Sequence, residues 1–202
     1  VSIFVEPMIE ELGWTRTKVS GLYTLGSLTA ASLMLMVGWL LDRFGARTLL
    51  ILVGVLFGGA ALWMSKVSSP LDLYFGFAAL RTLGQGSLTL VPTTLVSLWF
   101  IRLRGRVISI VSVGMMTSAA VFPILLHNLI GALGWRETWV VLTFSIWVLV
   151  TLPSIFFVRR TPESVGLLPD GGEIRSVENK ANSEPIDNWS FGEALRTRSL
   201  WL

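Results

Sequence analysis

The 202-residue sequence has no cysteine and few charged residues. Without cysteine, a disulfide framework and a thiolate metal site are both excluded. Charged residues make up 14% of the chain, against roughly 25% in a soluble globular domain. The sequence also lacks a phosphate-binding glycine loop, a cluster of metal ligands and a nucleophile–base pair. We therefore predict that the protein is not an enzyme, and that it uses no cofactor and no metal.

The sequence contains several long apolar runs. Hydrophobic residues make up 52% of the chain, and the mean hydropathy is +0.68. A helix of about 20 apolar residues matches the roughly 30 Å hydrocarbon core of a bilayer. A soluble all-α protein with buried helices is the alternative, but such helices rarely exceed about 14 apolar residues. We predict an all-α integral membrane protein whose main partner is the lipid bilayer.

The apolar runs predict six membrane-spanning helices, of which the first is incomplete. The expected spans are residues 1–8, 19–41, 48–64, 73–100, 107–130 and 138–158. A polar linker is expected over 159–190, followed by the approach to a further helix over 191–202. Because the chain starts without methionine and stops where an apolar run begins, we interpret it as a fragment of a longer protein.

Lysine and arginine are distributed unevenly among the connecting segments. Most of them lie in the turns 42–47 and 101–106 and in the tail from residue 159. The positive-inside rule therefore places these three segments in the cytoplasm. We expect a multi-pass protein of the inner cell membrane. The pI of about 9.8 then results from the excess of Lys and Arg in the cytoplasmic segments. Nucleic acid is not an expected partner.

A charged hinge, residues 38–47, separates the second and third spans. It resembles the G-x-L-x-D-R-x-G-x-R signature that joins these helices in the major facilitator superfamily. The matching residues are Gly38, Leu40, Asp42, Arg43, Gly45 and Arg47. Ala46 departs from the family, in which that position is often basic. The segment 160–171 is similar to the central loop of bacterial monocarboxylate and oxalate–formate-antiporter-like members.

This resemblance implies the six-helix N-terminal half-bundle of a twelve-helix carrier. The implied function is secondary transport by alternating access, along a pathway shared with the missing C-terminal half. The implied substrate is a small organic anion, a monocarboxylate or dicarboxylate, moved by proton symport or by exchange. A carrier of sugars or drugs, and a non-transporting receptor on the same fold, are the alternatives.

Asp42 is the candidate gating residue of the hinge. The resemblance implies a cytoplasmic latch that breaks as the two halves move. The carboxylate is within reach of Arg43, Arg47 or the basic turn 101–106, or it faces the positive end of a helix in the missing half. The alternative is a solvated turn that serves only topology.

Arg81 lies inside the fourth span, where a lone cation costs about 2.5–3.5 kcal/mol. Gln85 follows one helical turn later on the same face. The run Arg81-Thr-Leu-Gly-Gln-Gly resembles the R-x-x-Q-G motif of the superfamily's fourth helix, with Gln85 one place late. The functional interpretation is a site that attracts an anion or couples to a proton. A structural charge pair or a snorkelling side chain is the alternative.

Three further polar residues are candidates for the substrate or proton pathway. Tyr23 lies in the second span, and Asn128 lies near the end of the fifth. His127 is either a pH-sensitive gate or a polar residue at the membrane interface. Glycines in the apolar helices, above all the pair Gly54 and Gly58, predict close helix packing.

Overall fold

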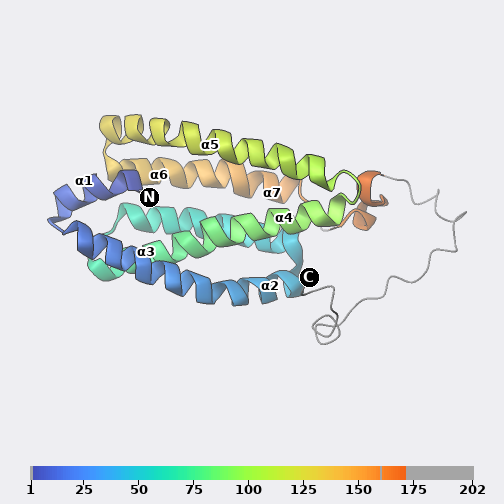
Figure 1. The fold of residues 1–202 in the computed structure, drawn as a ribbon, viewed down its shortest axis with the longest axis horizontal. Coiled ribbons are helices and arrows are strands. Elements are labelled where there is room, and N and C mark those ends of the chain that lie inside the picture. Colours follow the sequence, from blue (N-terminus) through green and yellow to red (C-terminus); the bar gives the residue numbers. More distant parts are fainter. Residues whose placement is uncertain (1, 160, 172–202) are drawn as a thin grey trace, which may run out of the picture.

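The computed structural model describes residues 2–159 and 161–171 (Figure 1). The expected approach to a further helix, 191–202, and the linker beyond 171 lie outside the described residues. Within the described part the long elements are all helices, which confirms the predicted fold class. In chain order they are α1 (Ser2–Leu12), α2 (Arg16–Ser65), α3 (Pro70–Leu80), η1 (Arg81–Ser87), α4 (Leu88–Trp99), α5 (Arg104–Leu133), α6 (Trp135–Ile146), η2 (Trp147–Thr151) and α7 (Leu152–Phe156).

The element α2 is a helical hairpin rather than one rod. Its 50 residues would extend about 75 Å at about 1.5 Å per residue, far beyond the thickness of a bilayer. The chain doubles back at Gly45, whose φ of 77° is costly for any residue with a side chain. The helix continues through Asp42, so the turn is narrower than the expected 42–47. Figure 1 shows the two limbs of α2 running in opposite directions.

Three helical runs of the described chain are long and apolar enough to cross a membrane, each with a mean hydropathy of 2.0. They are α2, α5 and the continuous run Trp135–Phe156. Because α2 reverses at Gly45, it supplies two crossings. A further run is formed by α3, η1 and α4, which follow one another without a break from residue 70 to residue 99.

The middle of the fourth predicted span departs from α-helical geometry. Its glycines and Pro92 are residues that weaken a regular α-helix. Residues Arg81–Ser87 form a π-helix between α3 and α4. The hydroxyl of Ser87 donates to the carbonyl of Thr82, five residues earlier, at 2.9 Å. This spacing matches the wider π turn, a feature found frequently at functional sites. The widened turn begins at Arg81, the cation expected within the fourth span.

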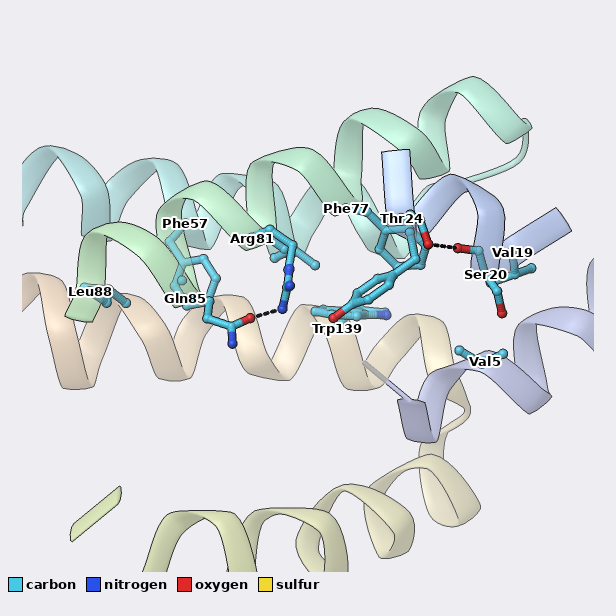
Figure 2. Close-up of a pocket in the computed structure, with 13 residues that line it drawn as sticks. Val5, Val19, Ser20, Thr24, Phe57, Phe77, Arg81, Gln85, Leu88 and Trp139 are labelled. Carbon is cyan, nitrogen blue, oxygen red and sulfur yellow. Dashed lines mark hydrogen bonds between the residues drawn. The ribbon is translucent and has the colours of Figure 1, made fainter. Parts of the chain in front are cut away.

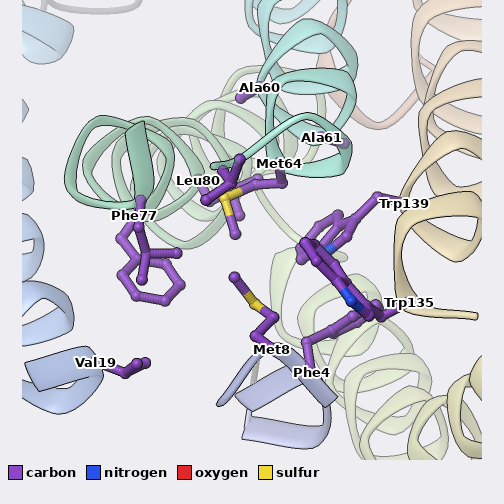
Figure 3. Close-up of a cluster of buried hydrophobic side chains, with 12 residues drawn as sticks. Phe4, Met8, Val19, Ala60, Ala61, Met64, Phe77, Leu80, Trp135 and Trp139 are labelled. Atoms are coloured by element: carbon purple, nitrogen blue, oxygen red, sulfur yellow. The ribbon is translucent and has the colours of Figure 1, made fainter. Parts of the chain in front are cut away.

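Two clusters of buried side chains hold the helices together. The cluster in Figure 3 joins α1, α2, α3 and α6, and its largest members include Phe4, Met8, Phe77 and Trp139. A second cluster lies toward the Gly45 turn, around Leu41, Leu49 and Val91. By contrast, α5 contributes no buried residue. It is therefore the least enclosed of the long helices in the described chain.

Close packing between α2 and the α6–η2 run depends on glycine. A Cβ atom on Gly54 would lie 2.6 Å from the hydroxyl oxygen of Thr151, and one on Gly58 would overlap the indole of Trp147. The same indole donates through Nε1 to the carbonyl of Val55 at 3.2 Å. The predicted packing face at Gly54 and Gly58 is confirmed, and it follows the small-residue rule for helices in lipid.

A polar network joins three helix ends at the side of the bundle away from the Gly45 turn. Glu11, at the end of α1, accepts hydrogen bonds from Trp135 Nε1 at 2.5 Å and from Arg136 Nε at 2.9 Å. Arg136 also donates through Nη1 to the carbonyl of Ser65, at the end of α2, at 2.9 Å. Its guanidinium lies 4.3 Å from the Trp135 ring centroid. The network ties α1, α2 and α6 together.

We expect Glu11→Gln to lower the thermal stability of the purified protein at neutral pH by a few degrees. The Arg136 and Trp135 donors hold the pKa of Glu11 below its ordinary value. A depressed pKa in the folded state gives stability above the unfolded-state pKa of about 4.3, and that stability is lost as the pH falls through the folded-state value. Because Glu11 is about half exposed, we expect the substitution to lower the free energy of unfolding by only about 0.5–1 kcal/mol.

Melting temperatures in detergent at pH 7 and pH 3 test this expectation. The gap between the parent protein and Glu11→Gln should narrow at the lower pH. The exposed neighbour Glu10 makes no hydrogen bond or ion pair among the described residues, so Glu10→Gln is the matched control. A pH-independent gap, or an equal loss in the control, would contradict the role given to Glu11.

Candidate functional site

A cavity of about 730 Å³ lies between α2, the α3–η1 run and α6, with α1 at one end (Figure 2). Its walls are largely apolar, and aromatic rings from Phe57 and Phe77 contribute to them. A few polar groups converge on it, which is the usual character of a small-molecule site. These polar side chains are Ser20, Tyr23, Thr24, Arg81, Gln85 and Trp139.

Among the described residues, Arg81 is the only cationic side chain that lines this cavity. Its Nη1 donates to Gln85 Oε1, so the two side chains lie on the same face one turn apart. Its guanidinium carbon lies 5.0 Å from the ring centroid of Tyr23, and Tyr23 packs edge-to-face on Phe77 with centroids 5.4 Å apart. These partners orient the guanidinium, but neither carries a negative charge. No carboxylate of the described chain pairs with Arg81, so its charge remains available to an anion.

Trp139 adds a hydrogen-bond donor that the sequence did not reveal. The side chain is 5% exposed and stacks on Phe4 with ring centroids 4.4 Å apart. Its Nε1 is buried and has no acceptor among the described residues. A buried donor without a partner costs about 1–3 kcal/mol, so a polar ligand in the cavity would gain by accepting from it. Because this burial depends on Phe4, from a helix far away in the sequence, no local pattern could have identified Trp139.

The other two pathway candidates lie elsewhere. His127 and Asn128 are exposed residues near the end of α5, and neither lines the cavity. Tyr23 does line it, and it contacts Arg81 directly. The structure therefore brings together Tyr23, Arg81 and Gln85 but leaves the two α5 residues apart from them.

The hinge arginines are directed away from Asp42. The Arg43 guanidinium lies 5.1 Å from the Trp39 ring centroid and 5.8 Å from that of Phe44. Arg47 donates through Nη2 to the carbonyl of Ile155, at the end of the α6–α7 run, at 3.1 Å. The carboxylate of Asp42 is exposed and forms no ion pair with the described residues. Of the alternatives for Asp42, an ion pair with Arg43, Arg47 or the basic turn 101–106 is therefore not formed among the described residues.

The remaining signature residues shape the turn itself. Leu40 packs against the second buried cluster, and Gly45 has the positive φ that allows the chain to reverse. Gly38 faces open space, since a Cβ atom there would meet no other atom within 4 Å. Within the hinge, Leu40 therefore faces the packed interior, whereas Asp42 and Arg43 lie on the exposed surface.

Apolar helices, a hairpin at a charged hinge and a cavity with one cation define a multi-pass membrane half-bundle. The family model of the Major Facilitator Superfamily matches residues 1–202. The chain belongs to this superfamily of transporters.

Several curated proteins are similar to the chain. The MFS transporter asaE of Aspergillus flavus is 29% identical over 139 residues, which cover 68% of this chain and 31% of the relative. The Probable sulfoacetate transporter SauU of Cupriavidus necator is 24% identical over 81% of this chain and 38% of its own length. A Multidrug resistance protein B homolog of Mycobacterium tuberculosis is 31% identical over 80% of this chain and 30% of its own length. The chain thus spans about a third of these relatives.

Proposed function

We propose that this chain forms the N-terminal half of a secondary transporter that moves a small organic anion by alternating access. The observation that carries the proposal is the Arg81 guanidinium, which lines the cavity without a carboxylate partner in the described chain. A cation at this depth costs about 2.5–3.5 kcal/mol on insertion scales. An anionic substrate bound beside Arg81 would offset that cost. A purely structural role would leave the cost of the unpaired cation unexplained.

The donors around the cavity suit an acid group. Arg81 offers a planar set of N–H donors that matches a carboxylate or sulfonate. Trp139 Nε1 supplies a further donor from a different helix. The volume of about 730 Å³ lies within the range of small-molecule sites. We therefore propose a monocarboxylate, dicarboxylate or sulfonated acid, carried with a proton or by exchange. The Cupriavidus necator relative is named as a probable sulfoacetate transporter, which supports this class.

A drug carrier is the second candidate. Aromatic side chains from Tyr23, Phe57, Phe77 and Trp139 line much of the cavity, and such walls suit large apolar molecules. The Mycobacterium tuberculosis relative carries a multidrug-resistance name. A cationic drug, however, would be repelled by Arg81, so this candidate requires a neutral or acidic compound.

Reconstitution of the full-length carrier into proteoliposomes tests the proposal. A thermal-shift screen selects among small carboxylates, sulfonates, sugars and cationic drugs, and counterflow of the radiolabelled hits then measures transport. We expect stabilisation and counterflow with an acid, and neither with sugars or cations. Counterflow of a sugar or a cationic drug without any acid would overturn the substrate class. Binding without counterflow would support a receptor instead.

We further propose that the Gly45 turn faces the cytoplasm and that Asp42 is a latch to the second half of the carrier. Its exposed carboxylate and the absence of an ion pair in the described chain support a partner elsewhere. We expect Asp42→Asn to reduce uptake at least tenfold at normal membrane abundance. The control is Asp72→Asn, at the opposite end of the bundle, which should retain uptake. Normal uptake in Asp42→Asn would remove the latch.

A further inference from the structure

The turn between α4 and α5, residues 100–103, is capped by a carboxylate from a distant part of the chain. Asp170 Oδ2 accepts hydrogen bonds from the backbone N–H of Arg102 at 2.8 Å and of Ile101 at 3.2 Å. Asp170 Oδ1 accepts from the N–H of Leu103 at 3.2 Å. One side chain thus satisfies three successive backbone donors of the turn. Figure 1 shows the segment that carries Asp170 lying beside the turn.

The start of α5 has no cap of its own. Its N-cap residue, Leu103, has no side-chain acceptor, and its first turn contains Arg104 and Arg106 but no acidic residue. The N-terminal N–H groups of a helix need acceptors and favour negative charge. In α3 these needs are met locally by the capping box of Ser69 and Asp72. At the start of α5, Asp170, which lies 67 residues further along the chain, supplies an acceptor for the N–H of the N-cap residue Leu103.

The segment that presents Asp170 is shaped for this contact. Asp170 has a φ of 63° and a ψ of 15°, a left-handed conformation that aspartate tolerates better than most residues. It is the centre of the short helical turn η4 (Pro169–Gly171), which follows the turn η3 (Glu163–Val165). The N–H of Leu167 donates to the carbonyl of Pro162 at 3.1 Å, which folds the approach back on itself. The three amides hold the pKa of the Asp170 carboxyl below its ordinary value.

The contact ties the turn before α5, the least enclosed long helix of the described chain, to the segment that follows α7. No residue of α5 is buried within the described chain, although Leu126 and Ile130 near its end pack against the first buried cluster. At the other end of the turn, α4 runs without interruption from η1, which carries Arg81 and Gln85. A cavity of about 480 Å³, lined by Arg102, Leu103, Arg106 and Asp170, lies beside the carboxylate. Asp170 therefore meets open space and can leave the turn without repacking of a core.

We propose that Asp170 is a releasable strap, which fastens the linker after the sixth crossing to the α4–α5 turn and transmits movements of the linker to α4 and α5. The strap deepens the proposed function, because it connects the segment leading toward the second half of the carrier with the helix that holds Arg81. Docking of Asp170 fixes the start of α5, and its release frees the turn to change position during the transport cycle.

Hydrogen exchange of the full-length carrier, followed by mass spectrometry, tests the docking directly. We expect Asp170→Ala to accelerate exchange of the Ile101, Arg102 and Leu103 amides at least tenfold. Asp170→Asn tolerates the same backbone conformation and keeps one acceptor, so it should give a smaller acceleration. Asp72→Asn is the matched control, because it removes a capping carboxylate from α3 and should leave residues 100–103 unchanged. Unchanged exchange in Asp170→Ala would overturn the strap.

A second measurement separates a strap from a simple stabilising contact. We expect Asp170→Ala to bind the acid selected by the thermal-shift screen within threefold of the parent affinity but to turn over at least tenfold more slowly. Equal losses of affinity and turnover, or unchanged turnover, would contradict the coupling. If no acid is transported by the parent carrier, the proposed function fails, whereas the exchange experiment still decides whether Asp170 docks.

Discussion

Substitution of Arg81 by glutamine is expected to reduce transport of the anionic substrate about a hundredfold without destabilising the carrier. Losing a charge-assisted, partly desolvated contact costs about 2–5 kcal/mol, and each 1.4 kcal/mol is a factor of about ten. The same change removes a cation from the membrane, where it costs about 2.5–3.5 kcal/mol. Stability should therefore hold or rise while uptake falls. Counterflow rates and melting temperatures of the purified variant measure both effects.

Two further variants show whether charge or shape matters at this position. Arg81→Lys keeps the charge but loses the planar donor geometry, so we expect an intermediate loss of about tenfold. Lys66→Gln removes a cation from an exposed turn between α2 and α3 and should leave transport unchanged. Normal transport by Arg81→Gln would contradict a role of Arg81 in anion binding. A melting temperature that falls in parallel with uptake would instead show that Arg81 is a structural residue.

Substitution of Gly58 by valine is expected to have the largest effect on folding. A side chain at this position would overlap the indole of Trp147 and displace its hydrogen bond to Val55. Overpacking of this kind costs about 1–3 kcal/mol, and the lost hydrogen bond adds about 0.5–1.5 kcal/mol. We expect a melting temperature lower by several degrees and a reduced yield of monodisperse protein in size-exclusion chromatography.

Gly59 provides an internal control for this prediction. It neighbours Gly58 on the same helix, but a Cβ atom there would meet no other atom within 4 Å. Both substitutions remove a glycine from a helix and add the same apolar side chain, so their intrinsic helix propensities are matched. Gly59→Val should therefore stay close to the parent protein. Equal losses in the two variants would show that close approach of α2 to the α6–η2 run is not what Gly58 provides.

Features that depend on neighbouring residues could be predicted from the sequence. The apolar runs predict the helices because length and hydropathy are local properties of the chain. The contact between Arg81 and Gln85 follows from one helical turn of separation, and the Gly54–Gly58 pair follows from the packing rule for lipid-embedded helices. The turn at Gly45 follows from a glycine within a charged hinge, although only the structure shows that the helix continues through Asp42.

Contacts between distant residues could not be predicted in this way. Only its burial against Phe4 and its unsatisfied Nε1 mark Trp139 as a site residue. The bond from Leu103 to Asp170 joins residues 67 positions apart, and that between Trp135 and Glu11 joins residues 124 apart. His127 and Asn128 were candidates because they are polar residues in an apolar run, but both are exposed and neither lines the cavity.

The sequence by itself determined that this protein is a bundle of apolar helices, with a charged hinge after its second apolar run and a cation inside its fourth. Those properties depend on composition and on residues within a turn of one another. Only the tertiary structure decided which side chains share a cavity with Arg81, which glycines allow close contact and which carboxylate caps α5. These depend on how helices far apart in the chain pack, and a linear pattern does not encode that directly.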